Sequence, residues 1–120
     1  MFKGELFIGK LQKQPEAAQT GSFRCFKSIP AGRYNLSIQA SEGHYCSPRK
    51  TCAPELYHSM ELAIFHRGRW LQINRSKVLR EFPRWDELRE RADGLGSRCP
   101  VFGYVPIDLI DDLYLYLINR

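Results

Sequence analysis

The sequence lacks the short motifs that identify common enzyme classes. It contains neither an HExxH zinc-protease motif nor a GxSxG nucleophile elbow. The glycines of GLG at 94–96 fit neither a phosphate-binding P-loop nor a dinucleotide-binding fingerprint. We therefore expect a non-enzymatic protein without catalytic residues, cofactor or bound metal.

Long apolar runs are also missing. The most apolar segment, near the C-terminus, is interrupted by Asp108, Asp111 and Asp112, so it cannot supply a bilayer-spanning helix. We expect these three aspartates to lie on a solvated helix face. The first residues, MFKGELFIGK, have no continuous apolar region and no small-residue cleavage site, which predicts a cytoplasmic protein without a secretory signal.

Cysteine and histidine are few, but two of each fall within HYCSPRKTCAPELYH at 44–58. The four residues, all zinc ligands by type, are His44, Cys46, Cys52 and His58. Their order, H-x-C-x5-C-x5-H, does not match the closely paired ligands of structural zinc sites. A reactive thiol is another reading, because nearby cations can lower a cysteine pKa. We favour a long loop that joins the strands at 33–41 and 58–66, with both cysteines tucked beneath it as small apolar groups.

The other cysteines and the third histidine carry weaker signals. Cys25 and Cys99 are far apart and belong to no pairing pattern, so we expect two buried thiols. His66 falls on the apolar parity of its segment, which places it at the core edge of a strand.

Apolar periodicity predicts an α+β fold in a single domain, 1–120. Strands are expected at 33–41 and 101–105, with a hairpin formed by 58–66 and 69–73 across a turn at Gly68. Residues 1–9 could add an edge strand. The resulting antiparallel sheet has three to five strands.

Two or three helices are expected to pack on this sheet. A short helix at 76–82 would begin with Ser76 as its N-cap, and a second helix would occupy 83–94. The clearest helix is 106–118, whose apolar residues follow the three- and four-residue spacing of one helix face. We expect helix 106–118 to cover one face of the sheet.

Charge is unevenly spread along a chain whose net charge is +5. Residues 1–80 hold 13 Lys and Arg against 5 Asp and Glu, whereas residues 81–120 hold 5 against 8. The segment 67–85 interleaves arginines with Trp70, Phe82 and Trp85, which suits contact with phosphates and bases. RNP, KH and helix-turn-helix patterns are missing from it.

We expect a small interaction protein that binds a protein partner or a ribonucleoprotein complex. Compact α+β chains of this size are common among accessory proteins of phages and mobile elements, and an anti-CRISPR-like inhibitor of a host defence complex fits this description. Direct nucleic-acid binding through 67–85 is the alternative, and a zinc or thiol protein centred on 44–58 is a third. The candidate partner-binding residues are those with arginine-rich or aromatic character expected of binding hot spots. They are Tyr45, Arg49, Lys50, Arg67, Arg69, Trp70, Arg75, Lys77, Arg80 and Arg84.

Overall fold

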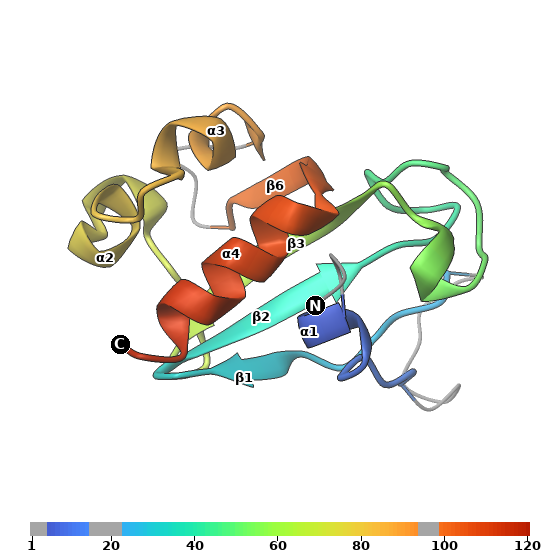
Figure 1. Cartoon of the computed structure of the whole chain (residues 1–120), viewed down its shortest axis with the longest axis horizontal. Helices are drawn as coiled ribbons and strands as arrows, with labels where there is room; N and C mark the ends of the chain where they lie inside the picture. The colour runs from blue at the N-terminus through green and yellow to red at the C-terminus, as the bar shows by residue number, and fades with distance from the viewer. Residues whose placement is uncertain (1–4, 15–22, 94–98) are drawn as a thin grey trace.

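An antiparallel sheet of six strands forms the centre of residues 5–14, 23–93 and 99–120, the part of the chain that the computed structural model describes (Figure 1). The strands run in the order β1–β2–β3–β6–β5, and β4 also pairs with β3. Their bounds are β1 (Ile29–Ala31), β2 (Tyr34–Gln39), β3 (Ser59–His66), β4 (Arg69–Trp70), β5 (Ala92–Asp93) and β6 (Val101–Pro106).

Helix α4 (Ile107–Leu117) lies across one face of this sheet, in front of β3 and β2 in Figure 1. The other α-helices are α1 (Glu5–Ile8), α2 (Lys77–Arg80) and α3 (Trp85–Arg89). Two short 3-10 helices, η2 (Pro54–Leu56) and η3 (Ile73–Arg75), shape the connections. The expected α+β fold, with the C-terminal helix covering the sheet, is confirmed.

The core forms between α4 and the facing side of β2 and β3. Strand β2 alternates buried and half-buried residues, as its sequence predicts. In its pairing with β3, Leu36 lies opposite Ile64 and Ile38 opposite Leu62. Leu113 and Leu117 of α4 are fully buried in the same apolar cluster. Burying a leucine or isoleucine stabilises a fold by about 1.5–3 kcal/mol, so this contact fixes the helix on the sheet.

The turn between β1 and β2 meets the end of α4. Gly32 has φ +62°, and a Cβ added there would lie 2.1 Å from the Leu117 carbonyl oxygen. Only glycine satisfies both the left-handed backbone and the close approach. The turn thereby holds the C-terminal end of α4 against the edge of the sheet.

Three expected elements are wrong in extent or kind. In place of an edge strand at 1–9, Glu5–Ile8 form α1, which packs on α4 and buries Phe7 completely. The strand expected at 69–73 ends at Trp70, because the chain leaves the sheet to bury Ile73 from a 3-10 turn.

The helix expected at 83–94 is the third. It spans only Trp85–Arg89, and Ala92 and Asp93 form β5 instead, paired with Phe102 and Val101 of β6. Gly94, the last residue of the expected helix, lies outside the described residues. Pairing with β6 provides hydrogen-bond partners for backbone groups that would otherwise be paired within a longer helix. This contact between distant segments overrides the local helical pattern.

Helices α2 and α3 are joined to the fold by polar contacts. The Ser76 hydroxyl accepts a hydrogen bond from the Leu79 N–H at 3.2 Å, which confirms it as the N-cap of α2. At the start of α3, Arg84 reaches across to α4, where it bonds to Asp112 at 2.6 Å and Asp108 at 3.1 Å. The expectation of a solvated position is wrong for Asp111, which is buried.

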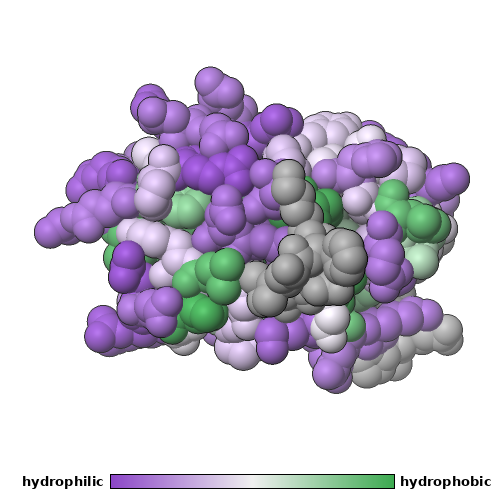
Figure 2. Space-filling view, viewed as in Figure 1, coloured by the Kyte–Doolittle hydropathy of each residue, from purple (hydrophilic) through white to green (hydrophobic). Residues whose placement is uncertain are grey.

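The surface seen from the α4 side is mainly hydrophilic, with apolar residues in separate patches (Figure 2). Scattered apolar residues of this kind are normal for a folded protein and do not mark a docking face. Among the described residues, no helix has both the length and the apolar character needed to cross a membrane.

Candidate functional site

The β3–β4 hairpin closes with a two-residue turn of arginine and glycine. Arg67 has φ +56° and Gly68 φ +76°, the combination required by the tight turn that best matches strand twist. The expected turn at Gly68 is confirmed. His66 and Arg69 form the closing pair, and Phe65 faces Trp70. The turn therefore presents Arg67 and Arg69 at the exposed tip, with Trp70 beside them.

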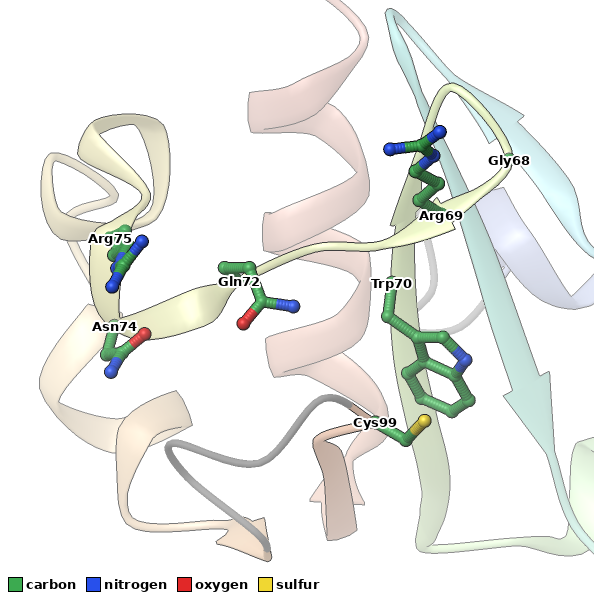
Figure 3. A pocket seen from close by; sticks show the side chains of 7 residues that line it. All are labelled: Gly68, Arg69, Trp70, Gln72, Asn74, Arg75 and Cys99. Atoms are coloured by element: carbon green, nitrogen blue, oxygen red, sulfur yellow. The ribbon is translucent and has the colours of Figure 1, made fainter.

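After Trp70 the chain leaves the sheet and a concave surface opens. The Leu71 N–H donates the last hairpin hydrogen bond, to the Ile64 carbonyl at 2.9 Å, and Ile73 then turns into the core. This bend separates β4 from η3, and Figure 3 shows Trp70 on one side, Asn74 and Arg75 on the other, and Gln72 between them.

Two adjoining hollows occupy this bend, with volumes of about 700 and 620 Å³. They share Arg69, Trp70, Gln72 and Arg75. We call their combined surface, residues 66–76 with Cys99, the arginine–tryptophan groove.

The charge of the groove is one-sided. Arg67, Arg69 and Arg75 line it, and in the described part of the chain no Asp or Glu does. Each guanidinium can bind a carboxylate or phosphate through two parallel hydrogen bonds. The amides of Gln72 and Asn74 add donors and acceptors. Such a surface suits an anionic partner that also carries planar or apolar groups for Trp70.

Three other predicted residues lie on α2 and at the start of α3. Arg80 is exposed, and Lys77 forms a 3.6 Å ion pair with Glu81 in which both side chains are largely exposed. Arg84 is engaged within the chain: Glu87, Asp112 and Asp108 accept its hydrogen bonds and raise its pKa. A partner role for these three residues stays a prediction.

The remaining candidates, Tyr45, Arg49 and Lys50, lie at the other end of β3. Ser47 forms a bridge with Ser59, the first residue of β3, whereas Trp70 faces Phe65 near its last. At about 3.3 Å per residue, the six steps between Ser59 and Phe65 cover roughly 20 Å. The structure therefore divides the predicted residues among separate surfaces.

The loop that carries Tyr45 is ordered by an arginine that sequence reasoning missed. Arg24 donates to the carbonyl oxygens of Cys52 at 2.6 Å and Ala40 at 2.7 Å, and to the Tyr57 hydroxyl at 3.0 Å. Its guanidinium also lies 4.6 Å from the centre of the Phe26 ring. No local pattern marks Arg24, because its hydrogen-bond partners are 16 to 33 residues away.

The side chains of the 44–58 segment have partners of their own. The Cys46 thiol is buried and donates to the carbonyls of Ser41 and Pro48 at 3.3 and 3.4 Å, and burial raises its pKa. His44 shares a 2.7 Å hydrogen bond with the Ser41 hydroxyl, and burial, with the charges of Arg24 and Arg49, lowers its pKa.

The segment forms no cluster of metal ligands, and its buried Cys46 is not an activated thiol. Across 5–14, 23–93 and 99–120, no three His, Cys, Asp or Glu side chains gather as metal ligands. A raised thiol pKa disfavours the thiolate that nucleophilic chemistry needs. The expected burial is correct for Cys46, whereas Cys52 is half-buried. The prediction that Cys25 and Cys99 are buried is wrong. Cys25 is half-buried and Cys99 is exposed, because each lies in a connection outside the core.

Comparisons of the chain with protein-family models, with curated proteins and with solved structures found no match. The function is therefore argued from the surface itself.

Proposed function

We propose that the chain is a small non-enzymatic protein that binds an anionic macromolecule in the arginine–tryptophan groove. The observation that supports the proposal is that Arg67, Arg69, Arg75 and Trp70 line the two adjoining hollows, with no carboxylate among the described lining residues. Tryptophan and arginine are the residues most enriched at binding hot spots. An acidic patch on a protein or a ribonucleoprotein complex would meet both features.

The shape of the groove favours a large partner. Its two hollows adjoin each other on an exposed hairpin and are lined by seven and eight of the described residues. A small ligand is usually enclosed over most of its surface, and an open bend between a hairpin and a 3-10 turn does not enclose one. The expected role as an anti-CRISPR-like inhibitor in the cytoplasm belongs to this proposal and rests on chain size and makeup.

A second candidate, direct binding of single-stranded nucleic acid, is supported by the aromatic pair under the groove. The rings of Trp70 and Phe65 are 4.7 Å apart at 51°, and the amides of Gln72 and Asn74 line the same hollow as Trp70. Bases stack on aromatic rings and offer hydrogen-bonding edges to amides, while arginines neutralise the phosphates.

A pull-down with charge-reversal variants tests the proposal. The tagged chain would be incubated with a lysate of its source cells or their host, with and without nuclease, and the captured material identified by mass spectrometry. We expect Arg69→Glu with Arg75→Glu to abolish capture. The matched control, Lys10→Glu with Lys27→Glu, makes the same charge change on exposed lysines at another hollow and should capture normally.

The nuclease arm separates the two candidates. A partner that survives nuclease supports the protein or ribonucleoprotein reading, and capture that disappears supports nucleic acid. Equal capture by the groove variant and the wild type would contradict both candidate functions.

A further inference from the structure

A β-bulge in β6 turns a tyrosine out of the sheet. Met60 pairs with Val105 and Leu62 with Phe102, so Gly103 and Tyr104 together oppose the single residue Glu61. Phe102 and Val105 are both buried, and Tyr104 between them is 43% exposed. Bulges commonly re-aim a side chain, and this one presents an aromatic ring to solvent.

Tyr104 is held in this position against its own backbone preference. Its φ is +53°, in the left-handed region that a tyrosine rarely adopts. Its N–H donates to the Tyr45 carbonyl, and its carbonyl accepts from Arg91 Nη1, each at 2.9 Å. Gly103 admits Tyr45 at close range, since a Cβ there would lie 3.1 Å from Tyr45 Cβ. Strain maintained by several surrounding contacts is typical of functional positions.

The result is an exposed pair of tyrosines over a hollow. The ring centroids of Tyr45 and Tyr104 are 5.9 Å apart with their planes at 32°, and Tyr45 is 39% exposed. The hollow has a volume of about 370 Å³. Its lining is completed by Gly103 with Glu90, Arg91 and Asp93.

The charge around this hollow is opposite to that of the groove. Glu90 and Asp93 line it, and Arg91, the one basic residue among its described lining residues, already donates to the Tyr104 carbonyl. Glu61 is half-buried behind the bulge. Burial and, more weakly, the charge of Asp93 raise the pKa of its carboxyl group, opposed by a hydrogen bond from the Tyr45 backbone and by Arg49. A cation bound here would offset the repulsion between Asp93 and Glu61.

We propose that this tyrosine–carboxylate hollow binds a lysine or arginine side chain of a partner protein. Cations bind over the faces of tyrosine rings, and Arg49 already does so within the chain, 5.4 Å from the centre of Tyr45. In the described part of the chain, no cation lies over Tyr104. The ring of Tyr104, with Asp93 and Glu90 beside it, supplies both a face and a counter-charge. Phosphate groups would be repelled by the same carboxylates, so nucleic acid does not fit.

The proposal is tested by titrating the chain, labelled with ¹³C in its tyrosine rings, with the capped peptide Gly-Lys-Gly. The matched probe replaces lysine with norleucine, which keeps the alkyl chain and removes the charge. We expect a saturable shift of the Tyr45 and Tyr104 ring signals with the lysine peptide alone. In Asp93→Asn the affinity should fall about threefold or more, a loss that surface charge pairs commonly produce.

Two further variants keep the test independent of folding and of the groove. Tyr104→Gly removes the ring while glycine accepts the positive φ, so it should stay folded and lose the shift at Tyr45. Asp86→Asn, at an exposed position of α3 outside the hollow, should bind as the wild type does. No saturable shift, the same shift with norleucine, or unchanged binding in Tyr104→Gly would overturn the proposal. The groove plays no part in this titration, so either proposal can fail alone.

Discussion

Trp70 lies directly opposite Phe65 across the β3–β4 pair, with ring centroids 4.7 Å apart. The contact fixes the indole at one side of the arginine–tryptophan groove, where it remains partly exposed. Cross-strand aromatic pairs contribute about 0.5–1.5 kcal/mol beyond the area they bury, so Trp70 has a structural role as well.

Trp70→Ala should lower both the affinity for the captured partner and, because it also removes the contact with Phe65, the stability of the fold. A hot-spot tryptophan is worth about 2 kcal/mol or more, which corresponds to a loss of about 30-fold in affinity. Calorimetry with the captured partner measures this loss. Trp70→Phe, which retains a ring against Phe65, should keep most of the binding. Unchanged affinity in the alanine variant would show that Trp70 lies outside the interface.

Two glycines with similar backbone angles should differ sharply when changed to alanine. At Gly68, φ is +76° and an added Cβ meets nothing within 4 Å. Gly68→Ala should therefore lower the free energy of unfolding only by the penalty of placing alanine in the left-handed conformation, about 1–2 kcal/mol. At Gly32 the added Cβ also meets the Leu117 carbonyl, so Gly32→Ala should cost clearly more. Urea unfolding of both variants checks the order, and equal losses would contradict the fixed contact between turn and α4.

Arg24 should be the residue on which the order of the 41–58 loop depends most. A lysine cannot reach the carbonyls of Cys52 and Ala40 and the Tyr57 hydroxyl together, because it lacks the planar fork of donors. We expect Arg24→Lys to lower the free energy of unfolding by about 1.5–3 kcal/mol, the value of a hydrogen bond to a charged group. Arg33→Lys, at an exposed turn position, serves as control. Equal stability of the two variants would remove Arg24 from this role.

The Arg84 cluster should make stability depend on acid pH. Hydrogen bonding to Arg84 lowers the pKa of the Glu87 carboxyl group below its unfolded value. A lowered carboxyl pKa contributes stability that is present above the unfolded pKa and is lost as pH falls through the folded one. We expect the melting temperature of the wild type to fall more between pH 7 and about pH 3 than that of Arg84→Gln. Parallel pH profiles of the two melting temperatures would show that the cluster does not contribute to stability.

Periodicity predicted the parts of the fold that depend on one buried face. Strand β2 and helix α4 agree with their patterns because each buries a regular stripe of side chains in the common core. The pattern misled at 1–9, where a segment too short for a clear period forms α1 instead. Residue 73 was expected in a strand, but Ile73 is buried in the core cluster from a 3-10 turn outside the sheet, and such a tertiary contact leaves no local pattern.

The surfaces were harder to foresee than the core. The composition of 67–75 pointed to Arg67, Arg69, Trp70 and Arg75, and the structure brings these together. Gln72 and Asn74 were missed because the groove exists only where the chain bends away from β4. Tyr104 was missed as well, since its segment reads as an ordinary strand and its bulge arises from pairing with a distant one. The bulge residue Gly103 was the one local signal that could have suggested it.

Oxidation of Trp70 by hydroxyl radicals, in the chain alone and in its complex with the captured partner, tests the central claim most directly. The rate of oxidation reports exposure of the indole itself, and Leu56, which is 61% exposed in η2, serves as the internal reference. We predict that the partner slows oxidation of Trp70 severalfold and leaves Leu56 unchanged. An unchanged rate at Trp70 in a saturated complex would contradict binding in the arginine–tryptophan groove.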